Sequence, residues 1–306
     1  DDCPPVFGVY RSSRLRLFEH PQTPALLHPA SLLRFRRNVH SEAGEDGIIA
    51  FLVEALGIDH GFCFEFGAWD GVFASNCRFW YEHGWDGLMV EAEEDKFQVL
   101  RRNYRNLPNV ALVNAIMEVE GANSMGALVA EHAGREQEVT VLSIDVDGLD
   151  FLFFSSLGVD GSFRPLIIIV ECNGFIRPDL PVSISQEESN NNMQQSLLLF
   201  KRKGQELGYT LLCFTQNAIF VRADLYPAVL AHLGGTPPPA SVSRLYADAL
   251  LINWNDMLLN VRATRSGMPP ALVKAETEHF GSFQAHVTVE EALERARAEE
   301  ERGEPE

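Results

Sequence analysis

Acidic and amide side chains recur at the ends of short apolar runs in this sequence. They are Glu65, Glu91, Asn114, Asp145 and Glu171. In an open α/β sheet, ligands bind beyond the carboxyl ends of the strands, near the point where the strand order reverses. If each apolar run is a strand, these side chains gather along one edge of the sheet, and that edge is the predicted binding site.

A glycine turn follows the first of these residues, in the stretch FCFEFGAWDGVFASN. The dinucleotide fingerprint GxGxxG brings a backbone close to a pyrophosphate. Here Trp69 stands where a second glycine would, and the carboxylates of Glu65 and Asp70 accompany Gly67 and Gly71. Each close carboxylate–phosphate pair would cost about 1 kcal/mol or more. The turn therefore suits a cation such as S-adenosylmethionine, which carries a sulfonium and an ammonium but no phosphate. The alternative is that both glycines only form the turn.

Glu91 ends the next apolar run, 20 residues after Gly71. That position suits an acid that accepts both ribose hydroxyl protons. A bulky side chain at Gly67 is expected to fill the space of the methionine part of the cofactor and to leave the fold intact.

A second acidic set lies in the segments SIDVDGLD and VECN, which contain Asp145, Asp147, Glu171 and Asn173. Carboxylate and amide oxygens are the ligands that Mg²⁺ prefers. A cation held by Asp145, Glu171 and Asn173 would lower the pKa of a substrate hydroxyl and orient it. The alternative is that Asp145 binds the ammonium of the cofactor, Asp147 begins a helix, and Glu171 accepts backbone N–H groups.

Hydrophobic patterning predicts the elements that position these residues. The predicted strands are 62–66, 87–91, 110–114, 139–145, 166–171, 209–214 and 218–222, and the predicted helices lie near 45–56, 95–106, 124–133, 150–157 and 193–207. Strands that are apolar on both faces and alternate with helices indicate a doubly wound, mostly parallel α/β sheet. The last two strands are separated by a short turn, so an antiparallel hairpin is expected at one edge.

Three regions are predicted: an N-terminal arm at 1–40, a binding domain at 41–224, and a C-terminal helical extension with an acidic tail at 225–306. Within the domain, the polar, proline-interrupted stretch 174–196 is longer than most connections, which is typical of a functional loop or of a disordered segment. It is predicted to be a lid over the acceptor, with Arg177 and Asn190 to Asn192 as contacts.

The composition of the chain limits the kinds of binding partner that we expect. The chain has 25 basic and 43 acidic residues and a net charge of -18, which would repel a nucleic-acid backbone. Its five cysteines have no metal-binding or disulfide spacing, and no apolar run reaches the length of a membrane span. We expect a cytoplasmic protein that binds neither nucleic acid nor membrane.

The segments SEAGEDGII, FEFGAWDGVFASN, GWDGLMVEAEEDKF, NSM, LSIDVDGLDF and IIIVECN occur in this order. Together they resemble the class I S-adenosylmethionine-dependent methyltransferases, and specifically the FkbM-type branch and its relatives. The resemblance covers about residues 41–222 and implies a Rossmann-like methyltransferase sheet. The acids of the second set are similarly placed to those that hold the cation in metal-dependent O-methyltransferases.

The resemblance also implies roles for individual residues. Those implied to contact the cofactor are Ser41, Glu65, Gly67, Ala68, Asp70, Gly71, Asn76, Glu91, Ala92, Asn114, Asn123, Ser124 and Asp145. Two departures from the family pattern are Trp69 inside the glycine turn and the run His40-Ser41-Glu42 in place of Tyr-Ser-Gln. Asn123 and Ser124 could instead be only a helix cap, and Glu45 and Asp46 could only favour a helix N-terminus.

The expected activity is S-adenosylmethionine-dependent O-methylation of a small metabolite such as a sugar or polyketide, with Asp145, Asp147 and Glu171 as catalytic candidates. Methyl transfer is an in-line displacement, so the enzyme mainly aligns the acceptor and excludes water. The alternative is a non-catalytic binding or scaffold module with the same fold. The expected partner is a small-molecule acceptor, and self-association into a homo-oligomer is left open.

Overall fold

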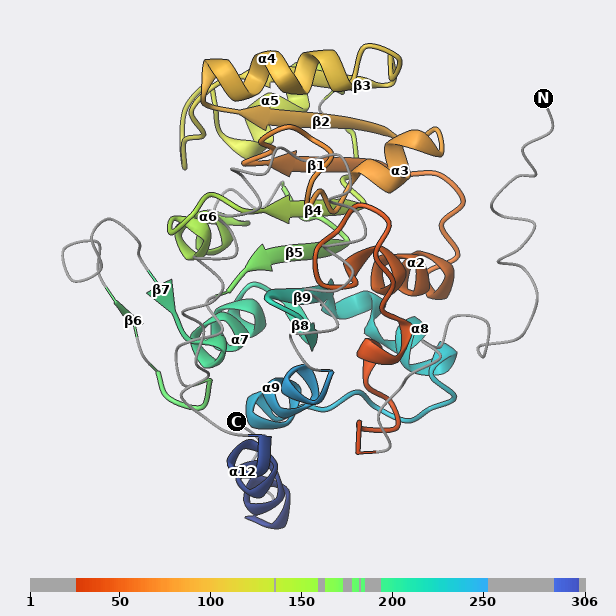
Figure 1. Cartoon of the computed structure of the whole chain (residues 1–306), viewed down its shortest axis with the longest axis vertical. Coiled ribbons are helices and arrows are strands. Elements are labelled where there is room, and N and C mark those ends of the chain that lie inside the picture. Colours follow the sequence, from red (N-terminus) through yellow and green to blue (C-terminus); the bar gives the residue numbers. More distant parts are fainter. Residues whose placement is uncertain are drawn as a thin grey trace, which may run out of the picture.

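The computed structural model describes residues 26–134, 136–158, 163–172, 178–181, 183–184, 194–252 and 289–302. Its centre is a seven-stranded sheet with the order β3-β2-β1-β4-β5-β9-β8 (Figure 1). The strands from β1 to β5 are parallel to their neighbours, whereas β9 runs antiparallel to both β5 and β8. The predicted α/β class, with a mostly parallel sheet and an antiparallel edge hairpin, is confirmed.

The strands match the apolar runs closely. Their bounds are β1 (Phe62–Phe66), β2 (Asp86–Glu91), β3 (Val110–Asn114), β4 (Val141–Ile144), β5 (Ile167–Glu171), β8 (Tyr209–Phe214) and β9 (Asn217–Arg222). The fourth strand is shorter than the predicted range 139–145, because its register with β1 and β5 extends only from Val141 to Ile144. Strand order reverses between β1 and β4, as in other doubly wound sheets.

Helices cover both faces of the sheet. One face carries α2 (Glu45–Ala55), α3 (Arg78–Glu82) and α4 (Glu94–Asn103), and the other carries α5 (Met125–His132), α6 (Asp150–Ser156) and α7 (Leu197–Glu206). On the first face, a Cβ added to Gly87 of β2 would lie 2.1 Å from the ring of Tyr81 in α3. On the second, the rings of Phe66 in β1 and Phe153 in α6 have centroids 5.3 Å apart. The sheet is therefore packed between two apolar layers, one on each face.

Helix α3 was not predicted. It has only five residues, RFWYE, and follows directly from the glycine turn. A single turn that is rich in aromatic residues has no helical periodicity to read. The helices α2, α4, α5, α6 and α7 lie within a few residues of their predicted ranges, whereas η2 (Leu32–Phe35) and α8 (Tyr226–His232) had no predicted range.

Segments from both ends of the chain pack together beside β8. The helices η2 and α9 (Val242–Leu251) contact β8, α12 (Val289–Arg302) packs on α9, and α8 packs on α2. The buried carboxylate of Asp248 in α9 accepts the His28 N–H at 3.3 Å and pairs with Arg244 at 2.9 Å. Ser243 donates to Glu299 of α12 at 2.6 Å. The charged C-terminal helix is thus confirmed, and it docks on α9.

The predicted lid is described in part. Its two-residue strands β6 (Ser183–Ile184) and β7 (Gln194–Gln195) pair antiparallel. Arg177 and Asn190 to Asn192 lie outside the described residues.

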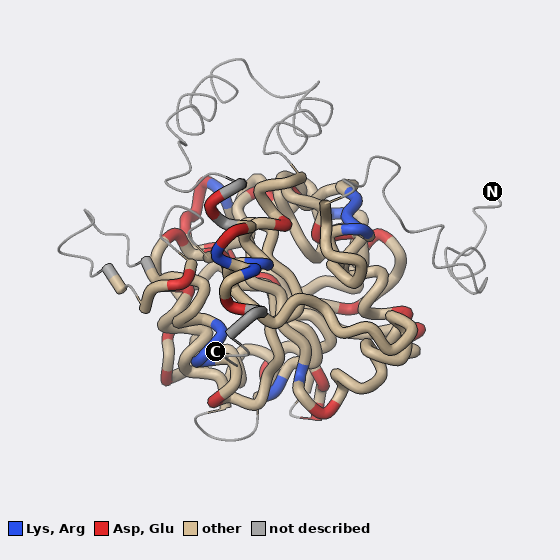
Figure 2. Tube along the Cα trace, turned by 90° about the horizontal axis from the view of Figure 1, so that it is seen from below, with Lys and Arg blue, Asp and Glu red and all other residues tan. Residues whose placement is uncertain are grey.

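Acidic positions lie on every side of the described chain, with Lys and Arg scattered among them (Figure 2). In this part of the chain, no helix combines the length and apolar composition needed to span a membrane.

Candidate functional site

The predicted site residues meet along the carboxyl edge of the sheet. Glu91, Asn114 and Glu171 are the last residues of β2, β3 and β5, Glu65 is the penultimate residue of β1, and Asp145 follows β4. Glu91 and Asn114 are direct register partners. Because the five strands are parallel, their ends face one binding edge.

The glycine turn is fixed by close backbone packing. Gly67 has φ of 75°, and a Cβ added there would lie 1.5 Å from the carbonyl oxygen of Asp145. The expectation that a side chain at Gly67 leaves the fold intact is therefore wrong, because the backbone after β4 would have to move. Gly71, with φ of 71°, faces Leu100 of α4 and Tyr104, the residue that follows this helix.

The backbone N–H groups of the turn are already donated within the protein. Ala68 N–H donates to the carbonyl of Val90, and Gly71 N–H donates to the carbonyl of Ala68. Trp69 N–H donates to Glu91 Oε2 at 2.7 Å. The N–H groups of Val72 and Phe73 donate to Asp70 Oδ1 at 2.8 and 2.9 Å. Asp70 therefore shapes the turn through its own backbone.

The carboxylate of Glu91 is held in one orientation. It is buried, and its two oxygens accept the N–H groups of Trp69 and Glu93, each at 2.7 Å. Asn114 Nδ2 donates to the carbonyls of Glu91 and Ala92 at 2.9 and 3.2 Å. Each carboxylate oxygen has two lone pairs, so Glu91 can still accept hydrogen bonds from a ligand.

Glu65 lies under the turn. Its carboxylate accepts the Ser75 hydroxyl at 2.6 Å and the Asn76 N–H at 2.9 Å. Burial raises the pKa of Glu65 to about 7. Asn76 Nδ2 in turn donates to the Ser143 hydroxyl of β4 at 3.0 Å. These contacts link the turn to β1 and β4, and the predicted contacts of Glu65 and Asn76 with a cofactor remain predictions.

Asn123 and Ser124 lie on the loop after β3. Ser124 is the N-cap residue of α5, yet its hydroxyl donates to Gly121 O at 3.0 Å and makes no capping bond to the helix. The N–H of Asn123 donates to Glu118 at 3.2 Å. Their predicted place on the adenine side of a cofactor remains a prediction.

A cluster of acids lies where β4 and β5 end. One carboxylate oxygen from each of Asp145, Asp150 and Glu171 lies within 4.8 Å of the others. Sequence reasoning missed Asp150, which is buried in the first turn of α6 and accepts the N–H groups of Val146 and Gly148, each at 2.8 Å. Asn173 lies outside the described residues, so its part in a metal site stays a prediction.

The proximity of these acids shifts their protonation. Burial, followed by the charges of neighbouring acids, raises the pKa of Glu171 to about 8. The same causes raise the pKa of Asp145 well above its ordinary value, although its side chain is accessible to solvent. Three carboxylate oxygens within 4.8 Å of one another repel when all three groups are ionised, and carboxylate oxygens are among the ligands of Mg²⁺.

Asp147 lies between Asp145 and Asp150 in the sequence. It has a positive φ of 53°, which is uncommon for a residue with a side chain. It precedes α6 rather than beginning it, since α6 starts at Asp150.

A loop before α2 crosses the same edge. Asp46 Oδ2 accepts the N–H groups of Val39, His40 and Ser41 at 2.7 to 2.9 Å, and the Ser41 hydroxyl at 2.9 Å. The negative charge of Glu42 contributes to the raised pKa of both Asp145 and Glu171, so this loop adds a further acid to the edge.

The base of this loop is tied to the far hairpin. Glu45 is fully buried, and its Oε1 accepts Thr215 Oγ1 at 2.5 Å and Asn217 Nδ2 at 2.9 Å. Its other oxygen accepts the Ala43 N–H at 2.8 Å. Glu45 therefore does more than favour the N-terminus of α2. In the sequence, only the acid-rich run SEAGED indicates a role for Glu42. The residues around it do not show that it lies near the ends of β4 and β5.

No family model and no curated protein matches the chain. Among solved structures, it is similar to a TehB-like SAM-dependent methyltransferase from Corynebacterium glutamicum, with 10% identity over 61% of this chain and 89% of that one, at a TM-score of 0.35. It is also similar to TrmK from M. capricolum, solved with S-adenosylhomocysteine, with 7% identity over 80% and 96% of the two chains and a TM-score of 0.38. The CurJ carbon methyltransferase gives 12% identity, 59% and 53% coverage, and a TM-score of 0.40. Likeness at this level says nothing about what the present chain binds or catalyses.

Proposed function

We propose that this chain is an S-adenosylmethionine-dependent methyltransferase. The proposal rests on the backbone N–H groups of the glycine turn, which are already hydrogen-bonded within the protein. Residues 68, 69, 71, 72 and 73 all donate their backbone N–H to acceptors within the protein. A phosphate-binding loop instead leaves such groups free to point at the ligand. The turn is thus poorly suited to a dinucleotide and well suited to a cofactor without phosphate.

The fixed carboxylate of Glu91 supports the same proposal. It lies beside the turn at the end of β2, with lone pairs left for two ribose hydroxyls. The basic group nearest to it in sequence, Lys96, pairs with Glu93 at 2.7 Å. The acids at the ends of β4 and β5 complement the sulfonium and ammonium of the cofactor, since opposite charges attract most strongly where water is excluded.

For the acceptor, we propose a hydroxyl of a small metabolite, methylated at the end of β4 and β5. Burial and mutual repulsion raise the pKa of Asp145 and of Glu171, so whichever of the two carboxyls is ionised is the stronger base for the acceptor's proton. A divalent cation would be held by Asp145, Asp150 and Glu171, and when bound it would lower the pKa of that hydroxyl. The FkbM-type branch belongs to the same proposal and rests on the ordered segments of the sequence.

Calorimetry on the full chain tests the cofactor. We expect S-adenosylmethionine and S-adenosylhomocysteine to bind with micromolar affinity, and nicotinamide dinucleotide to bind much more weakly. Glu91→Gln should weaken the binding of S-adenosylmethionine and of S-adenosylhomocysteine. Glu94→Gln, which changes an exposed acid on the same side of the sheet, should leave both affinities unchanged. Tighter binding of the dinucleotide would reverse the proposal. Absence of any cofactor binding would favour a non-catalytic scaffold.

A further inference from the structure

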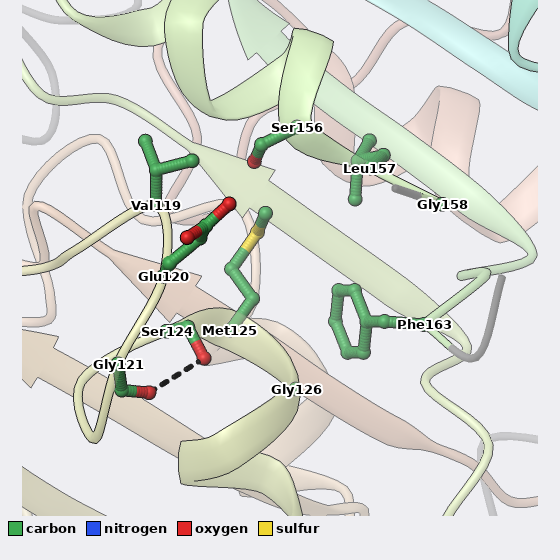
Figure 3. Close-up of a pocket in the computed structure, with 10 residues that line it drawn as sticks. All are labelled: Val119, Glu120, Gly121, Ser124, Met125, Gly126, Ser156, Leu157, Gly158 and Phe163. Atoms are coloured by element: carbon green, nitrogen blue, oxygen red, sulfur yellow. Dashed lines mark hydrogen bonds between the residues drawn. The ribbon is translucent and has the colours of Figure 1, made fainter. Parts of the chain in front are cut away.

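A cavity of about 280 Å³ lies away from the strand-edge acids, between the start of α5 and the end of α6 (Figure 3). Its lining comes from the segment 119–126, the segment 156–158 and Phe163. The lining residues are Val119, Glu120, Gly121, Ser124, Met125, Gly126, Ser156, Leu157, Gly158 and Phe163. Of these, only Ser124 belongs to the predicted cofactor contacts.

One wall of the cavity is apolar. Met125 and Leu157 are buried, and their side chains and the ring of Phe163 border the same space (Figure 3). Gly126 leaves room in this wall, since the nearest atom to an added Cβ would be the Cβ of Phe163 at 3.8 Å. Thioether and aromatic groups pack favourably against a flat ring.

The hydroxyl oxygens and the carboxylate that line the cavity are placed to accept hydrogen bonds. The Ser124 hydroxyl already donates to Gly121 O at 3.0 Å, and the Ser156 hydroxyl donates to Phe153 O at 2.7 Å. The carboxylate of Glu120 points toward Ser156 and the tip of Met125 (Figure 3). Among the described residues, no salt bridge to Glu120 is formed, and no lining residue is basic. The cavity therefore combines an apolar wall with one uncompensated negative charge.

We propose that this cavity binds a small aromatic amine. The ring would lie against Met125, Leu157 and Phe163, and the ammonium would donate to the carboxylate of Glu120 and to the hydroxyl oxygens. An aromatic carboxylate of the same size would place its charge against Glu120 and be repelled. Apart from Ser124, which is also predicted on the adenine side of the cofactor, the cavity shares no lining residue with the proposed cofactor site, and binding here is tested without cofactor.

Methyl NMR of the full chain with ¹³C-labelled methionine tests the site directly, because the sequence has only six methionines and Met125 can be assigned with Met125→Leu. The probes are tryptamine and indole-3-acetate. We expect tryptamine to shift the Met125 methyl signal saturably, and indole-3-acetate to do so at least about tenfold more weakly. No saturable shift at Met125, or equal binding of the two probes, would overturn the proposal.

Two variants test the apolar wall and the carboxylate of Glu120 separately. Gly126→Leu should fill the cavity and weaken tryptamine by at least about tenfold. Its matched control, Glu131→Leu, changes an exposed position on the same helix and should bind tryptamine normally. Glu120→Gln should weaken tryptamine about threefold and narrow the difference between the two probes, as expected for a solvent-exposed charge pair. Unchanged affinity in both Gly126→Leu and Glu120→Gln would refute the assignment.

Discussion

Replacing Glu65 with glutamine should change how stability depends on pH while leaving the fold in place. Glu65 is 6% exposed, and its carboxylate accepts hydrogen bonds from Ser75 and Asn76. Glutamine has nearly the same shape. Its amide oxygen can replace one of the two acceptors. The other bond is lost, because Ser75 Oγ already accepts the N–H groups of Cys77 and Arg78 at 3.4 and 3.0 Å, and this loss gives an offset in stability that does not depend on pH.

The magnitude follows from the shift in pKa. Burial raises the pKa of Glu65 from an ordinary 4.5 to about 7. Between these values the folded protein holds a proton that the unfolded chain has lost, so the free energy of unfolding falls as the pH rises. One pKa unit corresponds to about 1.4 kcal/mol, and the full shift to roughly 3 kcal/mol. Glutamine does not ionise, so the stability of Glu65→Gln relative to wild type should rise by roughly this amount from pH 4.5 to pH 8 and then level off.

Urea unfolding followed by tryptophan fluorescence at several values between pH 4.5 and pH 8 measures this difference. The control is Glu131→Gln, because Glu131 is exposed on α5 and its substitution should give a difference that does not change with pH. Other buried acids contribute equally to wild type and variant, so they cancel in the comparison. A constant difference between Glu65→Gln and wild type would refute the claim that this carboxyl is protonated near neutral pH.

The remaining predictions concern the binding edge. Gly67→Ala should lower the melting temperature far more than Gly57→Ala, because both glycines have positive φ but only the first has backbone, the carbonyl of Asp145, in the way of a Cβ; similar losses would contradict this. Glu91→Gln should weaken S-adenosylhomocysteine by about 1 to 3 kcal/mol in calorimetry, and an unchanged dissociation constant would remove Glu91 from the site. Mn²⁺ binding, followed by electron paramagnetic resonance, should weaken about tenfold or more in Glu171→Gln while the cofactor still binds; unchanged Mn²⁺ binding would show that any cation lies elsewhere.

Much of the sheet could be predicted because its strands are buried on both faces. The runs at 62–66, 110–114 and 209–214 coincide with β1, β3 and β8. Each is an apolar run of five or six residues between polar or glycine-containing segments, and that signal is local. The edge where the site lies followed from the polar residues that end these runs.

The partners of the site residues could not be predicted, because they depend on the paths of loops. Asp150 approaches Glu171 only because the chain after β4 turns back through Asp147. Gly67 is required by a carbonyl almost 80 residues away in sequence, at Asp145. Sequence spacing carries no record of such approaches, so residue types suggested the kind of chemistry without the contacts.

The hydrogen bonds between Glu45 and the β8–β9 hairpin affect the order in which parts of the chain can fold during synthesis. Glu45 precedes its donors Thr215 and Asn217 by 170 and 172 residues. A chain leaving the ribosome therefore carries the head of α2 long before these donors exist, and a buried carboxylate without donors is costly. We infer that α2 docks fully only after β8 and β9 have been synthesised. A nascent chain that stops after β5 would then contain every strand-edge acid described here and still lack a completed binding edge.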